Sequence, residues 1–251
     1  MARMVDAHAH IDRYTTSLAA ALEQIDSHEI VTVAVSMDVP SWQRTLAIAE
    51  SNRWIIPTFG IHPWEAWRYV GDLARLDRFL EATPFIGEAG LDFHWVENRD
   101  RYPAQRTVFE YQCEWARRRG VPMNLHTKGA EREILDALRD FGLRGSLVHW
   151  YSGPTELIDA FLSEGCWFTI GVEILCSPAI EAIATAIPPD RLLLETDNPG
   201  GYEWLAHEEG MPDIIFRVLE KTAVVKGMDA AELEDRLARS WSDFSRSWMR
   251  T

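Results

Sequence analysis

Short apolar runs alternate with amphipathic stretches along most of the chain. The first run covers residues 3–10 and carries polar side chains at every second position, Asp6, His8 and His10. Because alternate side chains of an extended strand share a face, these three should point the same way, with the two imidazoles about 7 Å apart. The run predicts a strand that presents paired metal ligands, the alternative being a half-buried strand with surface histidines.

The alternation of strand and helix then repeats. Further buried strands are predicted at residues 30–35, 54–59, 84–88, 121–126, 146–149, 166–170 and 191–195. Helical spacing of apolar residues predicts helices over 15–28, 41–52, 66–82, 104–119, 134–141, 155–163 and 179–186, and two more near 212–226 and 230–249. Eight strand-helix units predict an α/β fold, a (β/α)₈ TIM barrel with additional C-terminal helices, in a single domain over residues 1–251. A doubly wound sheet is the alternative, but it favours a Gly-rich first turn that this chain lacks.

Composition narrows the class of protein. The net charge of -14 argues against sequence-independent wrapping of duplex DNA, although a small metal-assisted phosphate site remains compatible with it. The three cysteines lack CxxC spacing, so neither a disulfide framework nor a thiolate zinc site is indicated. No run of about 18 apolar residues and no basic, apolar leader occurs, so the expected location is the cytoplasm, away from membranes.

Polar residues stand where the predicted strands end. In a parallel barrel the carboxyl ends of the strands meet on one face, where active sites lie. The residues at these positions are four imidazoles and two carboxylates, namely His8, His10, Glu88, His126, His149 and Asp197. Each alone could be a hydrogen-bonded core histidine or a turn-capping carboxylate. Their shared structural position favours one polynuclear metal site.

Six segments in chain order carry a family resemblance. They are residues 6–10 (DAHAH), 60–64 (GIHPW), 86–92 (IGEAGLD), 122–128 (PMNLHTK), 149–153 (HWYSG) and 193–199 (LLETDNP). Together they resemble the motifs of TatD-type metal-dependent hydrolases of the amidohydrolase superfamily, and the match spans residues 1 to about 200.

The resemblance implies a TIM barrel with two divalent cations and a deoxyribonuclease of the 3′ to 5′ exonuclease type. By position, one cation would be held by His8, His10 and Asp197, the other by His126 and His149, with Glu88 bridging where many superfamily relatives use a carboxylated lysine. Family members often have an arginine where this chain has Lys128, which keeps the charge but loses the bidentate fork.

Further candidates follow the strands. His62 ends the third strand without a place in the ligand set, so we expect it to contact phosphate or support a ligand. His94, in the loop after the fourth strand, is a second candidate for substrate contact. Several aromatic residues also follow strands and could stack unpaired bases or simply cover the barrel ends as apolar bulk: Trp64, Trp95, Trp150 and Trp204.

The reaction expected from this site is hydrolysis of a phosphodiester at a single-stranded or frayed DNA end. A water activated by two cations would attack phosphorus, Asp197 would accept its proton, Glu88 would bridge the cations, and Lys128 and His62 would steady the phosphate. Histidine ligands suit Zn²⁺ or Mn²⁺, whereas the family resemblance also admits Mg²⁺. The alternatives are a hydrolase of a small amide, lactone or phosphoester, and a non-catalytic metal-binding subunit. The sequence does not determine the oligomeric state.

Overall fold

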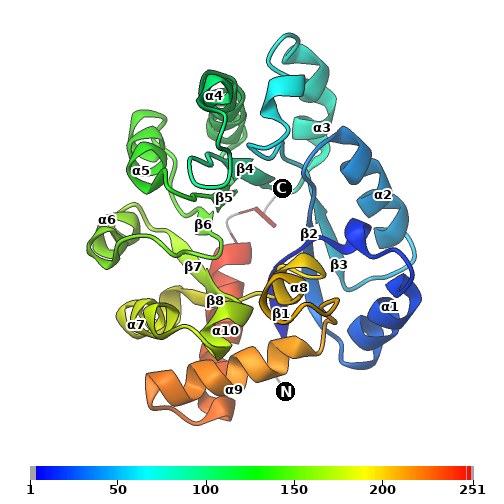
Figure 1. Ribbon diagram of the computed structural model, residues 1–251, viewed down its shortest axis with the longest axis vertical. Helices are drawn as coiled ribbons and strands as arrows, with labels where there is room; N and C mark the ends of the chain where they lie inside the picture. Colours follow the sequence, from blue (N-terminus) through cyan, green and yellow to red (C-terminus); the bar gives the residue numbers. More distant parts are fainter. Residues whose placement is uncertain (1–3, 247, 250–251) are drawn as a thin grey trace.

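The structure is a computed structural model that describes residues 4–246 and 248–249. In that part of the chain eight strands occupy the centre, and most of the helices surround them (Figure 1). The strands are β1 (Val5–Ala9), β2 (Val31–Val35), β3 (Ile55–Thr58), β4 (Ile86–Gly90), β5 (Met123–His126), β6 (Leu147–Val148), β7 (Trp167–Ile170) and β8 (Leu192–Leu194). All eight predicted strands are confirmed. Arg3 of the first predicted strand and Ser247 of the last predicted helix lie outside the described residues.

The strands are parallel and follow the order of the chain. β1, β2 and β3 form one sheet and β4 to β8 a second, so the backbone ladder does not close into one continuous sheet. Phe59 bridges to Ile86 between β3 and β4. After β8, the Asp197 N–H donates to the His8 carbonyl at 2.9 Å, which brings the end of β8 beside β1. The arrangement is consistent with the predicted (β/α)₈ barrel, with an interrupted ladder.

The helices alternate with the strands as predicted in most places. They are α1 (Leu18–Ser27), α2 (Val39–Ala49), α3 (Asp77–Ala82), α4 (Tyr102–Arg119), α5 (Glu131–Asp140), α6 (Ile158–Ser163), α7 (Pro178–Ala186), α8 (Gly200–Ala206), α9 (Ile214–Lys226) and α10 (Ala230–Ser245). α9 and α10 are the predicted additional C-terminal helices.

Two helical predictions were wrong or incomplete. The segment 66–82 is not one helix but two 3₁₀ turns, Ala66–Arg68 and Ala74–Leu76, followed by the short α3. Gly71 and Asp72 lie between the turns, and both residue types are poor helix formers. α8 was not predicted, because it begins with two glycines and is short, so its sequence gives little helical signal.

The last helix closes the amino-terminal end of the strands. Phe244 of α10 is fully buried, and its ring lies 5.6 Å from the rings of both Phe85 and Trp167. Phe85 directly precedes β4 and Trp167 begins β7, so α10 packs where the strands start, behind the strands in Figure 1. The carboxyl ends of the strands are left for the loops that carry the polar residues.

The cysteines form no disulfide among the described residues, and no described helix could span a membrane. Cys113 and Cys166 are buried, Cys176 is exposed, and all three are free thiols. Among the helices of residues 4–246, none combines the length and the apolar character needed to cross a membrane.

Close backbone packing fixes the position of β4. Gly60, just after β3, lies so near β4 that a Cβ built on it would be 2.3 Å from the Glu88 carbonyl oxygen. A Cβ on Gly87 would lie 2.5 Å from the Asn124 Cβ of β5. Only glycine fits these positions without moving the backbone. The placement of Glu88 therefore depends on Gly60 at the contact with the β3 side and on Gly87 of β4 at the contact with β5.

We predict that Gly60→Ala lowers the free energy of unfolding by about 1–3 kcal/mol, because the added methyl group must displace backbone rather than a flexible side chain. Gly71→Ala is the matched control, since a Cβ there meets nothing within 4 Å. Chemical denaturation followed by circular dichroism would measure both. Equal unfolding midpoints for the two variants would contradict the close approach.

Candidate metal centre

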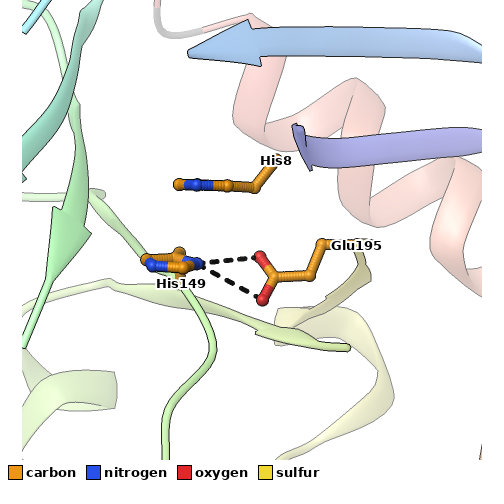
Figure 2. Close-up of side chains that lie close together, drawn as sticks. All are labelled: His8, His149 and Glu195. Atoms are coloured by element: carbon orange, nitrogen blue, oxygen red, sulfur yellow. Dashed lines mark hydrogen bonds and ion pairs between the residues drawn. The ribbon is translucent and has the colours of Figure 1, made fainter. Parts of the chain in front are cut away.

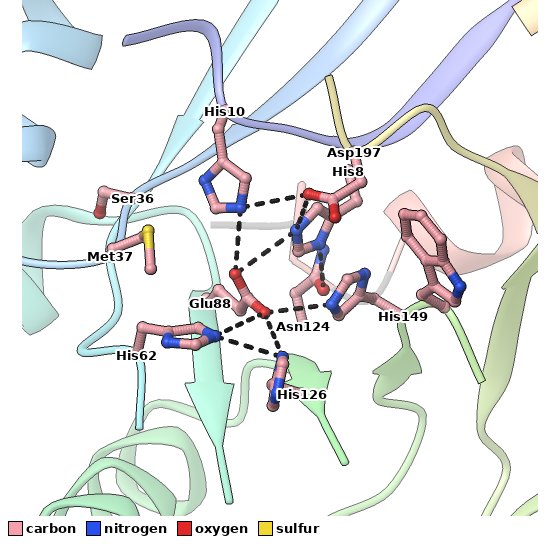
Figure 3. Close-up of polar contacts among 12 residues, drawn as sticks. His8, His10, Ser36, Met37, His62, Glu88, Asn124, His126, His149 and Asp197 are labelled. Atoms are coloured by element: carbon pink, nitrogen blue, oxygen red, sulfur yellow. Dashed lines mark hydrogen bonds and ion pairs between the residues drawn. The ribbon is translucent and has the colours of Figure 1, made fainter. Parts of the chain in front are cut away.

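The six polar residues predicted at the strand ends come together in the structure (Figure 3). β1 carries His8 and is followed by His10, β4 carries Glu88 and β5 ends in His126, while His149 and Asp197 follow β6 and β8. Five of them are buried, and the Asp197 side chain is 22 % exposed. Segments almost 190 residues apart in sequence thus meet at the carboxyl ends of the strands, as the barrel topology requires.

One oxygen of Glu88 faces His8 of β1 and His10, which follows that strand. Glu88 Oε2 lies 3.3 Å from His10 Nε2 and 3.5 Å from His8 Nε2, and Asp197 Oδ1 lies 3.3 and 3.6 Å from the same two nitrogens. Ligand atoms around one tetrahedral cation, with bonds of about 2.1 Å, are separated by roughly 3.4 Å. The four atoms are therefore spaced like the ligands of a single ion.

Three of these atoms are also buried polar atoms without a hydrogen-bond partner among the described residues: His8 Nε2, Glu88 Oε2 and Asp197 Oδ1. Burying a polar atom unpaired is costly, so such atoms are normally matched by a partner. A divalent cation bound between them would satisfy all three at once. The residues present fit a metal ion at this point.

The other oxygen of Glu88 faces a second group of imidazoles. Glu88 Oε1 lies 2.8 Å from His126 Nδ1, 3.1 Å from His149 Nε2 and 3.3 Å from His62 Nε2. One carboxylate thus presents its two oxygens to two separate sets of nitrogen donors. Imidazoles combined with carboxylates are a donor set that suits divalent transition metals.

The His8 ring is oriented by a hydrogen bond at Nδ1, the ring nitrogen that faces away from Glu88. Asn124 Oδ1 lies 3.0 Å from His8 Nδ1, and the Asn124 amide nitrogen donates to the Ala7 carbonyl, which fixes the orientation of the amide. His8 Nδ1 must therefore be the donor, so that Nε2 presents its lone pair to Glu88 and Asp197.

Carboxylates orient two further imidazoles in the same way. Asp92 Oδ2 lies 3.0 Å from His126 Nε2, and both oxygens of Glu195 lie 3.3 Å from His149 Nδ1 (Figure 2). Such carboxylate–histidine pairs fix the tautomer of a ligand and raise its basicity. Sequence reasoning missed Asn124, Asp92 and Glu195 as site residues. Two signals could have found them: each lies within two residues of a strand end, and each belongs to one of the six segments that carry the family resemblance.

The carboxylates and imidazoles of the cluster shift one another's pKa values. Burial acts to raise the pKa of Glu88, but His62, His149 and His8 lower it well below its usual value. Burial acts to lower the pKa of His10, yet the carboxylates of Asp197 and Glu88 raise it to about 10. Burial likewise opposes the shift at His149, where Glu195 and Glu88 raise the pKa to about 10. Glu88 therefore stays ionised, and His10 and His149 hold protons at neutral pH.

His62, which had no place in the predicted ligand set, lies inside the cluster. Its Nδ1 accepts the backbone N–H of Trp64 at 3.2 Å, so its Nε2 carries the proton of the neutral ring and points at Glu88 Oε1. Burial lowers the pKa of His62 to about 4, which keeps the ring neutral at pH 7. His62 is therefore placed as a hydrogen-bond donor rather than as a lone-pair ligand.

Two other predicted substrate contacts lie outside the cluster. Lys128 Nζ donates to the Trp150 carbonyl at 2.7 Å and to Ser152 Oγ at 2.8 Å, and burial lowers the pKa of Lys128. His94 is exposed, and its ring packs against Trp95 at 4.6 Å. Their roles in substrate binding stay predictions.

Asp6, predicted to share a strand face with His8 and His10, has a structural partner. It accepts the Thr196 backbone N–H at 3.0 Å and the Thr196 hydroxyl at 2.6 Å. This contact ties β1 to the segment after β8, where Asp197 adopts a positive φ of 52°. Strained backbone of this kind persists when its surroundings hold it, and it gathers at functional sites.

Comparison with known proteins adds relatives of similar length. The chain is 28% identical to an uncharacterized metal-dependent hydrolase, YabD of Bacillus subtilis, over 92% of this chain and 94% of the relative. It is 27% identical to the human deoxyribonuclease TATDN3, over 92% and 90%. It is also 27% identical to the 3'-5' ssDNA/RNA exonuclease TatD of Erwinia tasmaniensis, over 78% and 80%.

The fold has close counterparts among solved structures. The crystal structure of YJJV, a TatD homolog from Escherichia coli, superposes with a TM-score of 0.87 at 22% identity and covers 97% of this chain and 98% of its own. A TatD family hydrolase from Entamoeba histolytica gives a TM-score of 0.82 at 15% identity, with 97% and 98% covered. These likenesses confirm the predicted fold class.

The family model of the TatD related DNases matches residues 5–243, nearly the whole chain. The match includes every strand and both groups of imidazoles around Glu88. The chain therefore belongs to the TatD-related DNase family of metal-dependent hydrolases.

Proposed function

We propose that this protein hydrolyses phosphodiester bonds at the 3′ end of single-stranded or frayed DNA, with two divalent cations. The observation that carries the proposal is the buried Glu88, whose two oxygens face two separate sets of imidazole nitrogens. Names of relatives as deoxyribonuclease and as 3'-5' ssDNA/RNA exonuclease support the choice of substrate.

The residues divide between the two cations by their geometry. His8, His10, Asp197 and Glu88 Oε2 would hold one, and His126, His149 and Glu88 Oε1 would hold the other. When bound, the cations would supply Lewis-acid activation of a water and stabilise the charge that develops on the phosphate. The imidazole-rich donor set favours Zn²⁺ or Mn²⁺ over Mg²⁺.

In this proposal Asp197 accepts the proton of the attacking water. Its side chain is 22 % exposed, whereas that of Glu88 is 2 % exposed, so Asp197 can contact a water that enters from the mouth. Burial acts to raise its pKa, but His10 and His8 lower it to about 2, so the carboxylate is ionised at neutral pH. Proton transfer by a positioned side chain contributes about 10²- to 10⁴-fold to rate.

His62 and Lys128 complete the proposed binding of the phosphate. The Nε2–H of His62 donates toward Glu88 Oε1 and can hold the bridging carboxylate or a phosphate oxygen in place. The Lys128 ammonium uses two of its three donors on Trp150 and Ser152, which leaves one for a phosphate oxygen. In this proposal His94, which is exposed on the loop after β4, contacts the strand beyond the cleaved bond.

We predict that Asp197→Asn lowers the turnover of an end-labelled single-stranded oligonucleotide by at least about 100-fold, because the amide cannot accept the proton. Most of the bound metal should remain, since the other ligands are unchanged. Asp136→Asn, an exposed carboxylate of α5 outside the cluster, is the matched control. Elemental analysis would accompany the cleavage assay with Zn²⁺, Mn²⁺ and Mg²⁺.

Two results would refute this role and this function. A near-normal rate in Asp197→Asn would remove Asp197 from the chemistry. Wild-type protein that cleaves simple amides or esters but no oligonucleotide, under any of the three metals, would overturn the proposed substrate.

We also predict that the apparent affinity for a divalent cation rises with pH between 6 and 8. His10 and His149, with pKa values raised to about 10 in the metal-free protein, must lose their protons before they bind a cation. Each displaced proton should strengthen binding by about tenfold per pH unit. Calorimetric titration in buffers of different ionisation enthalpy would count the released protons, and binding that is independent of pH would contradict the assignment.

A further inference from the structure

We propose that a hollow beside the metal centre holds an unpaired base of the single strand that is being cleaved. This hollow, here called the aromatic hollow, has a volume of about 500 Å³ and is lined by Trp64, Trp95, Val96, Glu97, Asn98 and Arg101. The inference rests on the proposed function and names the feature of a nucleic acid that the site would recognise.

One residue, Asp92, links the aromatic hollow to the candidate metal centre. Asp92 Oδ2, which orients His126 from 3.0 Å, also accepts the indole N–H of Trp64 at 2.7 Å. The rings of Trp64 and His126 lie 6.4 Å apart between centroids. A base that packs on Trp64 would therefore be close to a phosphate held at the centre.

The loop that forms the hollow is already held in shape. Asp92 Oδ1 accepts the backbone N–H of His94 at 2.9 Å and that of Trp95 at 2.7 Å. The Asp92 backbone exchanges hydrogen bonds of 2.9 and 3.0 Å with the buried Gln105 amide of α4. The Tyr102 hydroxyl contacts the carbonyls of Phe93 and Val96. A wall that is fixed before binding loses little conformational entropy when a ligand arrives.

The indoles of the hollow present free apolar surface. Trp64 is 39 % exposed and Trp95 is 52 % exposed, although tryptophan is on average a largely buried residue. Every nucleobase has a π-face, so stacking on such indoles tolerates any sequence. This suits an enzyme that removes successive nucleotides from an end.

The charges at the hollow favour a base over a phosphate inside it. Glu97 belongs to the lining and would repel an anion, whereas a neutral base can approach it and use Glu97 and Asn98 as hydrogen-bonding groups. Arg101 lies at the same wall with its guanidinium 5.0 Å from the Trp67 ring. It supplies a cation for the phosphate that follows the base.

The test measures binding of a fluorescein-labelled oligothymidylate with uncleavable phosphorothioate linkages to the full-length, metal-loaded protein by fluorescence anisotropy. A second set of strands carries one abasic residue at each position in turn. Trp95→Ala removes one wall of the hollow but keeps the hydrogen bond to Asp92, because Trp95 makes that bond through its backbone N–H. Trp95→Phe keeps an aromatic face. Val224→Ala is the control, because Val224 is an apolar residue 75 % exposed on α9 and does not line the hollow.

We expect Trp95→Ala to bind the intact strand about five- to 100-fold more weakly, from the lost stacking of one base, while Trp95→Phe and Val224→Ala stay near wild type. One abasic position should weaken binding to the wild type by a similar factor. The same abasic strand should bind Trp95→Ala as well as the intact strand does, because removing both partners of one contact costs no more than removing one of them.

Equal affinity of Trp95→Ala and wild type for the intact strand would overturn the inference. So would an equal loss on every strand with no abasic position singled out, because that pattern belongs to a general structural change. Cleavage of an end-labelled strand by the wild type is scored separately. Cleavage with unchanged binding by Trp95→Ala defeats the aromatic hollow alone, whereas absence of cleavage defeats the proposed function.

Discussion

A buried carboxylate surrounded by imidazoles is the constraint on which the site depends. Glu88 is 1 % exposed, and an ionised carboxylate in such a place must be matched by positive charge and by hydrogen-bond donors. The side chains at the ends of β1, β5, β6 and β8 surround Glu88 and supply these groups. In the metal-free protein, protons on His10 and His149 supply the positive charge. Divalent cations would supply the same charge and would also satisfy the unpaired lone pairs of His8 Nε2, Glu88 Oε2 and Asp197 Oδ1.

The outer hydrogen bonds decide what each imidazole can do. Asn124, Asp92 and Glu195 each engage the remote nitrogen of one ring and so direct the other nitrogen inward. His62 has the opposite arrangement, because the Trp64 backbone donates to its Nδ1 and its Nε2 must be the donor. The same residue type therefore serves as lone-pair donor in one place and as hydrogen-bond donor in another. Asp92 extends this network outward to the aromatic hollow.

The two ends of the strands are divided between packing and chemistry. At the amino-terminal end α10 inserts Phe244 between Phe85 and Trp167 and fills the space with apolar side chains. Near the carboxyl end, the contact between Gly60 and the Glu88 carbonyl leaves no room for a side chain and holds β4 in register with its neighbours. The amino-terminal end is thus filled by apolar packing, while the loops at the carboxyl end carry the polar and aromatic groups.

The sequence by itself determined the order of strands and helices and the six polar residues at the strand ends, because hydrophobic period and strand position are local properties. It did not determine the break at Gly71, where the apolar spacing had outweighed two poor helix formers in the prediction, or the existence of α8, whose short segment with two leading glycines carries little helical signal. Only the tertiary structure decided that Glu88 faces two groups of imidazoles, that Asn124 orients His8 from 116 positions away, and that Trp64 and His126 share Asp92. These facts are distances and tautomers, and they exist only after segments remote in the chain have been packed side by side.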